Sequence, residues 1–245
     1  MDDLNQSLGY KYCQETKFKR TTLLSRKRPM IAPAETFKEY SEAPKFSLPK
    51  INFMEEESDL WQLLQKRRSL RKFSDKKMKS ADLSLLLWAS QGITAQAGHF
   101  MLRTAPSAGA LYPIETYLTV QNVDQMPAGL FHFNIRAFQL EQLSTKPLAR
   151  QVAESALDQN FIRRAGVTFI WSVVFRRNMS KYGHRGMRYV CLDAGHICQN
   201  LLLAAEALGL AACPVAAFYD DELNEILGLD HNEENVLYLA AVGCK

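Results

Sequence analysis

The stretch at residues 167–175, VTFIWSVVF, decides the fold, because nearly every residue in it is apolar. A run of this composition predicts a central strand that is buried on both faces of a sheet. The segment 114–121 alternates apolar and polar residues and predicts a second strand. Further strands are expected at 129–134 and 138–143, which form a hairpin, and at 211–215 and 236–242.

Two helices are expected before these strands, where apolar residues recur on one face. The first spans about residues 58–67, with Ser58 at its N-cap. The second spans residues 80–91, with Ser80 as its expected N-cap, and Gly92 stops it.

The rest of the chain mixes further helices with the strands. Short helices are expected at 147–157 and 220–227. A basic loop at 176–188 is expected to lead into a long helix that ends near Gly209. Because helices and strands alternate without a regular βαβ pattern, the sequence predicts the α+β class.

Residues 1–57 differ in character from the rest of the chain. They carry clusters of basic residues and little periodicity, and four prolines, Pro29, Pro33, Pro44 and Pro49, punctuate their second half. We therefore expect an N-terminal arm that wraps over the domain or over a partner. Residues 58–245 are expected to form the one domain.

Composition limits the classes of function. The 245 residues are 47% apolar with a formal net charge of +4, which predicts a sizeable core and no nucleic-acid partner. The five cysteines lack a C-x-x-C pair and the five histidines lack ligand spacing, so we expect neither a metal site nor a disulfide framework. The start of the chain is not a signal peptide, and Glu206, Gly209 and Pro214 interrupt the most apolar stretch. A cytoplasmic protein without a membrane partner is expected.

Several common catalytic motifs are absent from the sequence. No G-x-G-x-x-G follows a strand, and neither a P-loop nor a G-x-S-x-G elbow occurs. These absences leave Rossmann, P-loop and α/β-hydrolase sites without support.

The stretch RRSLRKF at 67–73 is the first candidate site. Four of its first six residues are basic, more than a helix end needs to complement its dipole. The guanidinium groups of Arg67, Arg68 and Arg71, with the hydroxyl of Ser69, suit an anion clamp for a phosphate. A solvated basic face is the alternative interpretation, because basic runs usually face water.

Two segments of small residues are further candidates. The turn at 106–109 has almost no side-chain bulk, so a flat ligand can lie against its backbone. The alternative is an ordinary tight turn before a strand. The segment 214–217 either presents backbone N–H groups to a ligand edge or simply ends a buried strand.

Together these segments resemble the nitroreductase-like FMN-dependent oxidoreductases, and most closely their SagB-type dehydrogenase branch. The resemblance covers about residue 58 to the C-terminus and rests on six landmarks in order, at 67–71, 91–94, 103–113, 181–185, 193–196 and 213–218. It implies a nitroreductase-like fold, in which helices flank a central, mostly antiparallel sheet. It also implies an intertwined homodimer.

The resemblance also implies an FMN site. Its residues would be Arg67, Arg68, Ser69, Arg71, Pro106, Ser107, Ala108, Gly109, Pro214, Val215, Ala216, Ala217 and Lys245. The basic segment would hold the phosphate and the ribityl chain, and the turn at 106–109 would come from the other subunit and border the ring. The segment 214–217 would run along the ring with an N–H near flavin N5.

Lys181 and Tyr182 match the Lys-Tyr pair that azoline-oxidising members use for proton transfer. The resemblance implies that this pair removes a substrate proton while a hydride passes to flavin N5, which would oxidise peptide azolines to azoles. A solvated basic loop is the alternative. Glu115 departs from the family pattern, because many simpler nitroreductases carry a lysine near this place.

Two other functions stay open at this point. One is an NAD(P)H-dependent reductase of nitro or quinone compounds, with a small-molecule substrate. The other is a non-catalytic module that binds a flavin or a partner, which the basic arm suggests.

Overall fold

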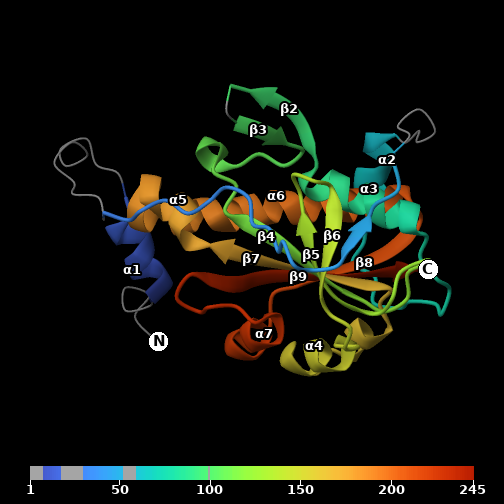
Figure 1. Ribbon diagram of the computed structural model, residues 1–245. Helices are drawn as coiled ribbons and strands as arrows, with labels where there is room; N and C mark the ends of the chain where they lie inside the picture. Colours follow the sequence, from blue (N-terminus) through green and yellow to red (C-terminus); the bar gives the residue numbers. More distant parts are fainter. Residues whose placement is uncertain (1–7, 18–29, 52–58, 99) are drawn as a thin grey trace.

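The computed structural model describes residues 8–17, 30–51, 59–98 and 100–245. The strands of its large sheet are Lys45–Ser47 (β1), Ile114–Val120 (β4), Gly129–Asn134 (β5), Gln139–Ser144 (β6), Val167–Val174 (β7), Leu210–Val215 (β8) and Glu234–Cys244 (β9). They are ordered β1-β6-β5-β4-β7-β9-β8, and neighbouring strands run antiparallel (Figure 1). The predicted central strand is confirmed, because β7 lies between β4 and β9 and only its last residue is not fully buried.

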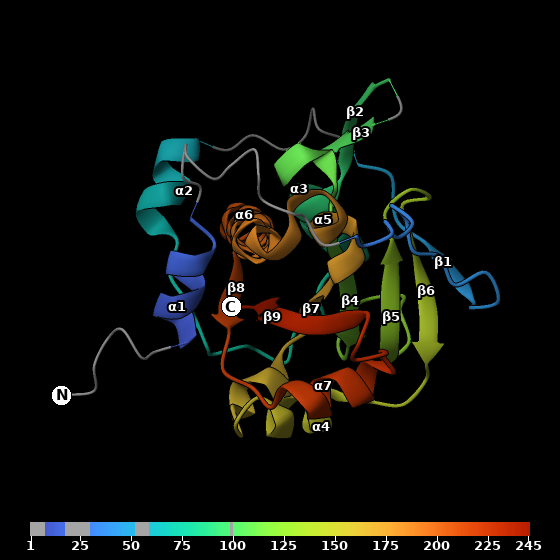
Figure 2. The same cartoon turned by 90° about the vertical axis from the view of Figure 1, so that its left-hand side faces the viewer.

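Helices cover both faces of this sheet. Their bounds are Leu8–Glu15 (α1), Leu60–Lys66 (α2), Ser80–Gln91 (α3), Ala149–Ser155 (α4), Phe175–Tyr182 (α5), Gly186–Ala207 (α6) and Asp220–Leu227 (α7). Short 3-10 turns span Ala108–Ala110 (η3), Asn160–Arg164 (η4) and Gly183–Arg185 (η5). Helices α3 and α6 lie on one face, and α4 and α7 lie on the other (Figure 1, Figure 2). The predicted α+β class is confirmed.

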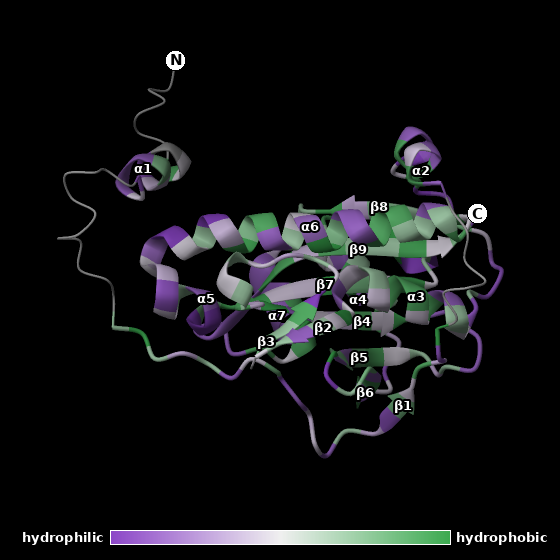
Figure 3. Cartoon of the chain, turned by 90° about the horizontal axis from the view of Figure 1, so that it is seen from above, coloured by the Kyte–Doolittle hydropathy of each residue, from purple (hydrophilic) through white to green (hydrophobic). Residues whose placement is uncertain are grey.

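Each face of the sheet carries its own apolar core. Leu83, Leu86 and Leu87 of α3 point inward as predicted and are fully buried. The long helix α6 runs along the same face, with hydrophobic and hydrophilic residues mixed around it (Figure 3). Because helices cover both faces, the polar residues of β4 are buried along with its apolar ones.

The predicted basic loop after the central strand is wrong, because residues 175–182 form helix α5. Arg177 is buried there and pairs with Glu115, and Arg176 pairs with Glu233. The carboxylate of Glu115 thus neutralises Arg177 away from water, whereas Arg176 and Glu233 pair at the surface.

The predicted helix caps also differ from the structure. The carboxylate of Asp59 accepts a hydrogen bond from the Trp61 backbone N at 2.9 Å and caps α2. The expected cap, Ser58, lies outside the described residues. Lys79, and not Ser80, is the N-cap residue of α3, and it makes no side-chain capping bond.

Gly92 stops α3 as predicted, and the chain then enters a hairpin that no pattern in the sequence indicated. Its strands are Ile93–Ala97 (β2) and Phe100–Arg103 (β3), which form a separate two-stranded sheet. A Cβ at Gly92 would lie 2.3 Å from the Trp88 ring, so this helix end needs glycine.

The expected N-terminal arm supplies partners to the sheet. Its strand β1 pairs with β6 at the sheet edge. Lys38 Nζ donates to Tyr117 Oη at 2.7 Å and pairs with the buried carboxylate of Glu234. Lys45 Nζ lies 2.8 Å from the buried carboxylate of Glu141. Residues 38–45 therefore neutralise two carboxylates of the sheet.

Candidate functional site

The predicted anion clamp and the segment 214–217 are neighbours in the structure. The Leu70 backbone N donates to the Ala212 carbonyl of β8 at 2.9 Å, and Ser69 forms a parallel bridge to the same residue. The clamp therefore lies along the free edge of β8, directly beside the residues that precede Pro214.

The basic side chains of the clamp stay near the surface. Arg67 is half-buried, while Arg68 and Arg71 are exposed. Arg68 Nη1 donates to the carbonyls of Gln65 at 2.9 Å and Arg67 at 2.8 Å. The Arg71 guanidinium lies 5.8 Å from the centroid of the Phe161 ring. Such planar, exposed groups can offer several N–H donors to a phosphate.

Two other predicted cofactor contacts lie close to this edge of the sheet. Lys245 follows β9, and its Nζ lies 3.4 Å from the carboxylate of Glu206 on α6. In the segment 214–217 the first two residues are half-buried or buried, and the last two are exposed. Gln159 Nε2 donates to the Ala217 carbonyl at 3.2 Å and holds the end of this segment.

The predicted small-residue turn is attached to α6 through Asp193. Ser107 Oγ donates to Asp193 Oδ2 at 2.6 Å, and the Ala108 N donates to Oδ1 at 3.3 Å. Ser107 Oγ also accepts a bond from the Tyr112 N at 2.9 Å. Burial raises the pKa of Asp193, although these two donors oppose the shift. The sequence placed Asp193 within a landmark but did not indicate this role.

Gly109 brings the turn against the predicted catalytic pair. Its φ is +65°, and a Cβ there would lie 2.6 Å from Tyr182 Oη and 2.8 Å from Lys181 Nζ. Lys181 Nζ lies 5.5 Å from the centroid of the Tyr182 ring, and that ring packs edge-on against Tyr189 at 4.9 Å. A larger residue at position 109 would displace the ends of both side chains, so the predicted turn and the predicted Lys-Tyr pair lie together within one chain.

The clamp and the turn do not meet within one chain. Asp193 holds the turn near the start of α6, whereas Glu206 contacts Lys245 near its end. The helix rises about 1.5 Å per residue, so about 20 Å of helix separates these two positions. Figure 1 shows α5 at one end of α6 and α2 at the other.

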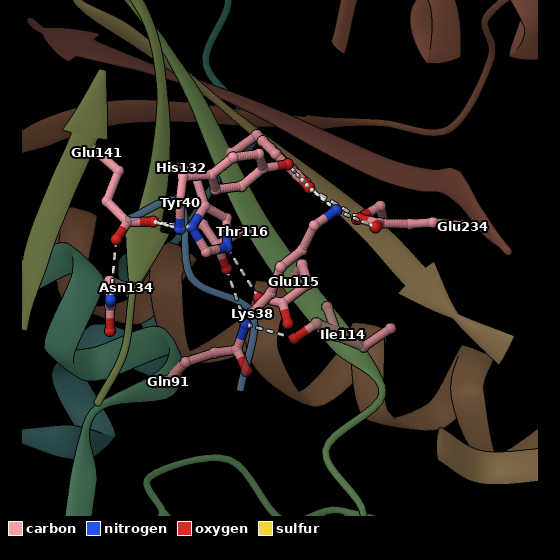
Figure 4. A network of polar contacts seen from close by, with 12 residues as sticks. Lys38, Tyr40, Gln91, Ile114, Glu115, Thr116, His132, Asn134, Glu141 and Glu234 are labelled. Carbon is pink, nitrogen blue, oxygen red and sulfur yellow. Dashed lines mark hydrogen bonds and ion pairs between the residues drawn. The ribbon is translucent and has the colours of Figure 1, made fainter. Parts of the chain in front are cut away.

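A buried polar network lies in the sheet and reaches α5 through Arg177, and sequence patterns did not reveal it (Figure 4). His132 Nε2 lies 3.0 Å from Glu115 Oε2, and His132 Nδ1 lies 2.9 Å from Glu141 Oε2. Arg177 Nη1 lies 2.5 Å from Glu115 Oε1. All four residues are buried. Glu115 thus stands in the sheet as the partner of two cations.

The network shifts the pKa values of its members. Burial alone would raise the pKa of Glu115, but Arg177 and His132 outweigh it and lower this pKa from 4.5 to about 2. Burial would lower the pKa of His132, but hydrogen bonds to Glu115 and Glu141 raise it above 6.5. The two carboxylates therefore favour the protonated form of the imidazole.

These shifts predict a stability maximum between the ordinary pKa values of 4.5 for Glu115 and 6.5 for His132. Below 4.5 the contribution of Glu115, on the order of 3 kcal/mol, is lost as the pH falls toward about 2. The contribution of His132 is complete below 6.5 and is lost as the pH rises through its raised pKa. Urea unfolding at a series of pH values measures the loss of stability on the acid side and on the basic side of this maximum.

The matched variants for this prediction are Glu115→Gln and Glu154→Gln. Glu154 is an exposed glutamate paired with Arg150 on α4. We expect Glu115→Gln to reduce the fall of the urea midpoint as the pH decreases below 4.5. Glu154→Gln should leave this fall unchanged. An equal fall in all three proteins would contradict the assignment.

The cysteines and possible metal ligands add no further site among the described residues. All five cysteines are free thiols. Within the ranges given above, no three His, Cys, Asp or Glu side chains are grouped as metal ligands. No helix in the described part of the chain combines the length and apolarity that a membrane span requires.

Comparison with known proteins places the chain in a family. The nitroreductase family profile matches residues 64–244. The protein MJ1384 of Methanocaldococcus jannaschii, which carries a nitroreductase name, is 36% identical over 190 residues, 78% of this chain and 93% of that protein.

Two peptide-processing proteins match a smaller part of this chain. The trifolitoxin-processing protein TfxB of Rhizobium leguminosarum bv. trifolii is 33% identical over 138 residues, 54% of this chain and 37% of TfxB. The microcin B17-processing protein McbC of Escherichia coli is 29% identical over 135 residues, 52% of this chain and 49% of McbC. The chain thus spans at most about half of these two relatives.

Solved structures share the fold. A Ralstonia eutropha protein with a nitroreductase name has a TM-score of 0.71 at 23% identity, covering 89% of this chain and 95% of that chain. The Escherichia coli microcin synthetase McbBCD complex with truncated pro-MccB17 bound has a TM-score of 0.62 at 23% identity, covering 80% and 78%. A Desulfovibrio desulfuricans nitroreductase structure in complex with FMN has a TM-score of 0.55 at 19% identity, covering 76% and 86%.

These findings confirm the nitroreductase-like fold that the six sequence landmarks implied. The family profile spans most of the chain, and it includes the clamp, the turn, the Lys-Tyr pair and β8. The chain belongs to the nitroreductase family of oxidoreductases.

Proposed function

We propose that this chain is an FMN-dependent oxidoreductase of the SagB-type dehydrogenase branch, acting on a small molecule or a modified peptide. The observation that carries the proposal is the contact of Gly109 with the ends of Lys181 and Tyr182. It gives a flat cofactor a bare backbone beside two groups that carry protons. The FMN-bound structure from Desulfovibrio desulfuricans and the processing names of TfxB and McbC support it.

The residues of the chain fit FMN at both of its ends. The exposed guanidinium groups of Arg68 and Arg71, with the Ser69 hydroxyl, would bind the phosphate. The segment 214–217 would run along the ring, because its last two residues are small and exposed. An N–H of this segment near N5 would tune the flavin. Gly109 would border the ring from the partner chain.

A homodimer would complete the site, because the clamp and the turn lie apart within one chain. Helix α2 has no buried residue, and its Trp61 side chain is 77% exposed. Leu60 and Leu64 of the same helix are also exposed. Exposed apolar side chains gathered on one helix are typical of an interface. A second copy packed there would bring one clamp to the partner's turn.

The Lys-Tyr pair would handle the proton of the reaction. When bound, FMN supplies a hydride acceptor at N5. Lys181 or Tyr182 would accept the proton that the substrate releases as the hydride leaves. For a peptide azoline, loss of one hydride and one proton forms the second ring double bond of an azole. Packing of Tyr182 against Tyr189 limits the movement of the phenol.

The relative MJ1384 favours a second candidate, an NAD(P)H-dependent reductase of nitro or quinone compounds. In this reaction the Lys-Tyr pair would donate a proton to the reduced substrate. Anaerobic mixing of the FMN-loaded protein distinguishes the candidates. Bleaching of the flavin by a thiazoline peptide supports the dehydrogenase, whereas bleaching by NAD(P)H and recovery with a quinone supports the reductase.

Reconstitution with FMN tests the proposal before any substrate is known. The purified chain, incubated with FMN and passed through a sizing column, should elute yellow as a dimer with one FMN per chain. Colourless protein after this treatment would overturn the proposed cofactor. A yellow monomer would overturn the shared site.

Loss of a clamp arginine should weaken FMN binding. We expect Arg68→Ala and Arg71→Ala each to raise the Kd about 10- to 100-fold, because a hydrogen bond to a charged group contributes about 1.5–3 kcal/mol. Quenching of flavin fluorescence measures the Kd. Arg150→Ala is the matched control, because Arg150 is an exposed arginine on α4. Equal affinities in all three variants would show that the clamp does not hold the phosphate.

A further inference from the structure

We propose that Arg177 is a positioning residue for the Lys-Tyr pair. Held by Glu115 in the sheet, it fixes helix α5 against the 106–112 segment, so that Lys181 and Tyr182 meet Gly109. The inference assigns a role to a buried ion pair, and its consequence for catalysis rests on the proposed function.

The Arg177 guanidinium joins three segments to α5. Its side chain is only 4% exposed, and Nη1 lies 2.5 Å from Glu115 Oε1 of β4. The same Nη1 donates to the Tyr112 carbonyl at 3.3 Å, and Nε donates to the Glu35 carbonyl at 2.5 Å. A single cation thus ties the sheet, the end of the turn and the arm to one helix.

The spacing of these contacts ties the ion pair to the reacting groups. Arg177 and Lys181 lie one helical turn apart on α5, where side chains at i and i+4 share a face. Tyr112 follows Gly109 by one short turn of chain. The segment 109–112 is therefore held to α5 at two points, by the Arg177 bond at one and by the Gly109 contact at the other.

The ion pair of Arg177 and Glu115 has little freedom to rearrange. Glu115 Oε2 already lies 3.0 Å from His132 Nε2, so its carboxylate is held from both sides. Breaking a buried ion pair costs about 3–5 kcal/mol, which favours one arrangement of α5 over others. Arginine suits this position because its planar fork serves several acceptors at once, whereas lysine is a compact point charge.

The start of the turn has a separate anchor. Asp193 holds Ser107 and Ala108 through the hydrogen bonds described above. Loss of Arg177 would therefore leave the turn on α6 and change only the junction with α5. This separation makes the effect of Arg177 local enough to measure.

The test compares three variants. Glu115→Gln with Arg177→Gln removes both charges, so that neither is left buried without its partner. Arg177→Lys keeps the cation beside Glu115 but has too few donors in the right plane for the carbonyls of Tyr112 and Glu35. Lys45→Gln is the matched control, because it removes a partner of the buried Glu141 at the other edge of the network.

The first readout is independent of activity. Reductive methylation with 13C-formaldehyde gives each lysine an NMR signal, and the Lys181→Arg variant identifies the signal of Lys181. In the native protein the nearby Tyr182 ring should displace this signal from those of solvated lysines. We expect the displacement to be lost in the double variant, reduced in Arg177→Lys and retained in Lys45→Gln.

The second readout is steady-state kinetics, in which kcat and KM are measured separately with the substrate that bleaches the flavin. A misplaced proton-transfer group costs about 100-fold in rate, so kcat should fall by this factor in the double variant while KM stays constant. FMN affinity should stay constant in all three proteins.

An unchanged Lys181 signal in the double variant would overturn the inference. If the double variant does not fold, an unchanged signal in Arg177→Lys would overturn it. So would an equal shift in Lys45→Gln. Absence of FMN binding by the native chain would instead count against the proposed function.

Discussion

A chain that lacks residues 1–50 should lose most or all of its free energy of unfolding. The deletion removes Lys38 and Lys45, which neutralise the buried carboxylates of Glu234 and Glu141. It also removes Tyr40, whose backbone N donates to Glu141 Oε2 at 3.0 Å. Removing one partner of a buried ion pair costs about 3–5 kcal/mol, and a whole domain is stable by only about 5–15 kcal/mol.

Urea unfolding followed by circular dichroism measures this effect. Deletion of residues 1–29 is the matched control, because it removes the contacts of residues 12–16 with residues 184–188 but keeps the described contacts of Lys38, Tyr40 and Lys45 with the sheet. We expect the shorter deletion to unfold within a narrow range of the native midpoint. A stable fold without residues 1–50 would show that Lys38 and Lys45 are dispensable. A role of the basic arm in partner binding should be tested with the shorter deletion, because only that variant should keep the fold.

Replacement of Gly109 by alanine should reduce turnover about 100-fold, the cost of misplacing a reacting group by about 1 Å. The new Cβ would lie 2.6 Å from Tyr182 Oη and 2.8 Å from Lys181 Nζ, so the ends of both side chains must move. A residue other than glycine at a φ of +65° adds a backbone cost on the order of 1–2 kcal/mol.

Gly228→Ala is the matched control, because it has the cost of a positive φ without a steric clash of the new Cβ. Gly228 has a φ of +67° at the end of α7, and a Cβ there would meet no atom within 4 Å. Both variants should lose a similar amount of stability in thermal unfolding, but only Gly109→Ala should lose turnover. Equal turnover in the two variants would remove Gly109 from the site.

The sequence predicted those elements whose pattern is local. The run at 167–175 correctly indicated a central strand, because covering helices on both faces require apolar residues on both sides of the strand. The last helix was predicted at 220–227, and it occupies Asp220–Leu227. The hairpin of β5 and β6 was also predicted, because alternation and turn residues report directly on the neighbouring backbone.

The predictions failed where distant residues override local preference. A segment with four arginines and one lysine between 176 and 188 was expected to be a loop, yet Glu115 and Glu233 pair with two of its cations and allow a helix. In the sequence Glu115 looked only like a departure from the family pattern. In the structure it is buried between Arg177 and His132, and no alternation of apolar residues can signal such a pairing.

The sequence by itself determined the order and type of most elements, the α+β class and the segments that carry the candidate chemistry. Only the tertiary structure decided that Gly109 touches Lys181 and Tyr182, and that Asp193 holds Ser107 across 86 positions of the chain. The physical reason is that sequence patterns report on neighbouring residues, whereas a site is built from residues far apart in the chain. Periodicity records which face of an element is buried, whereas a site depends on which buried faces of distant elements meet.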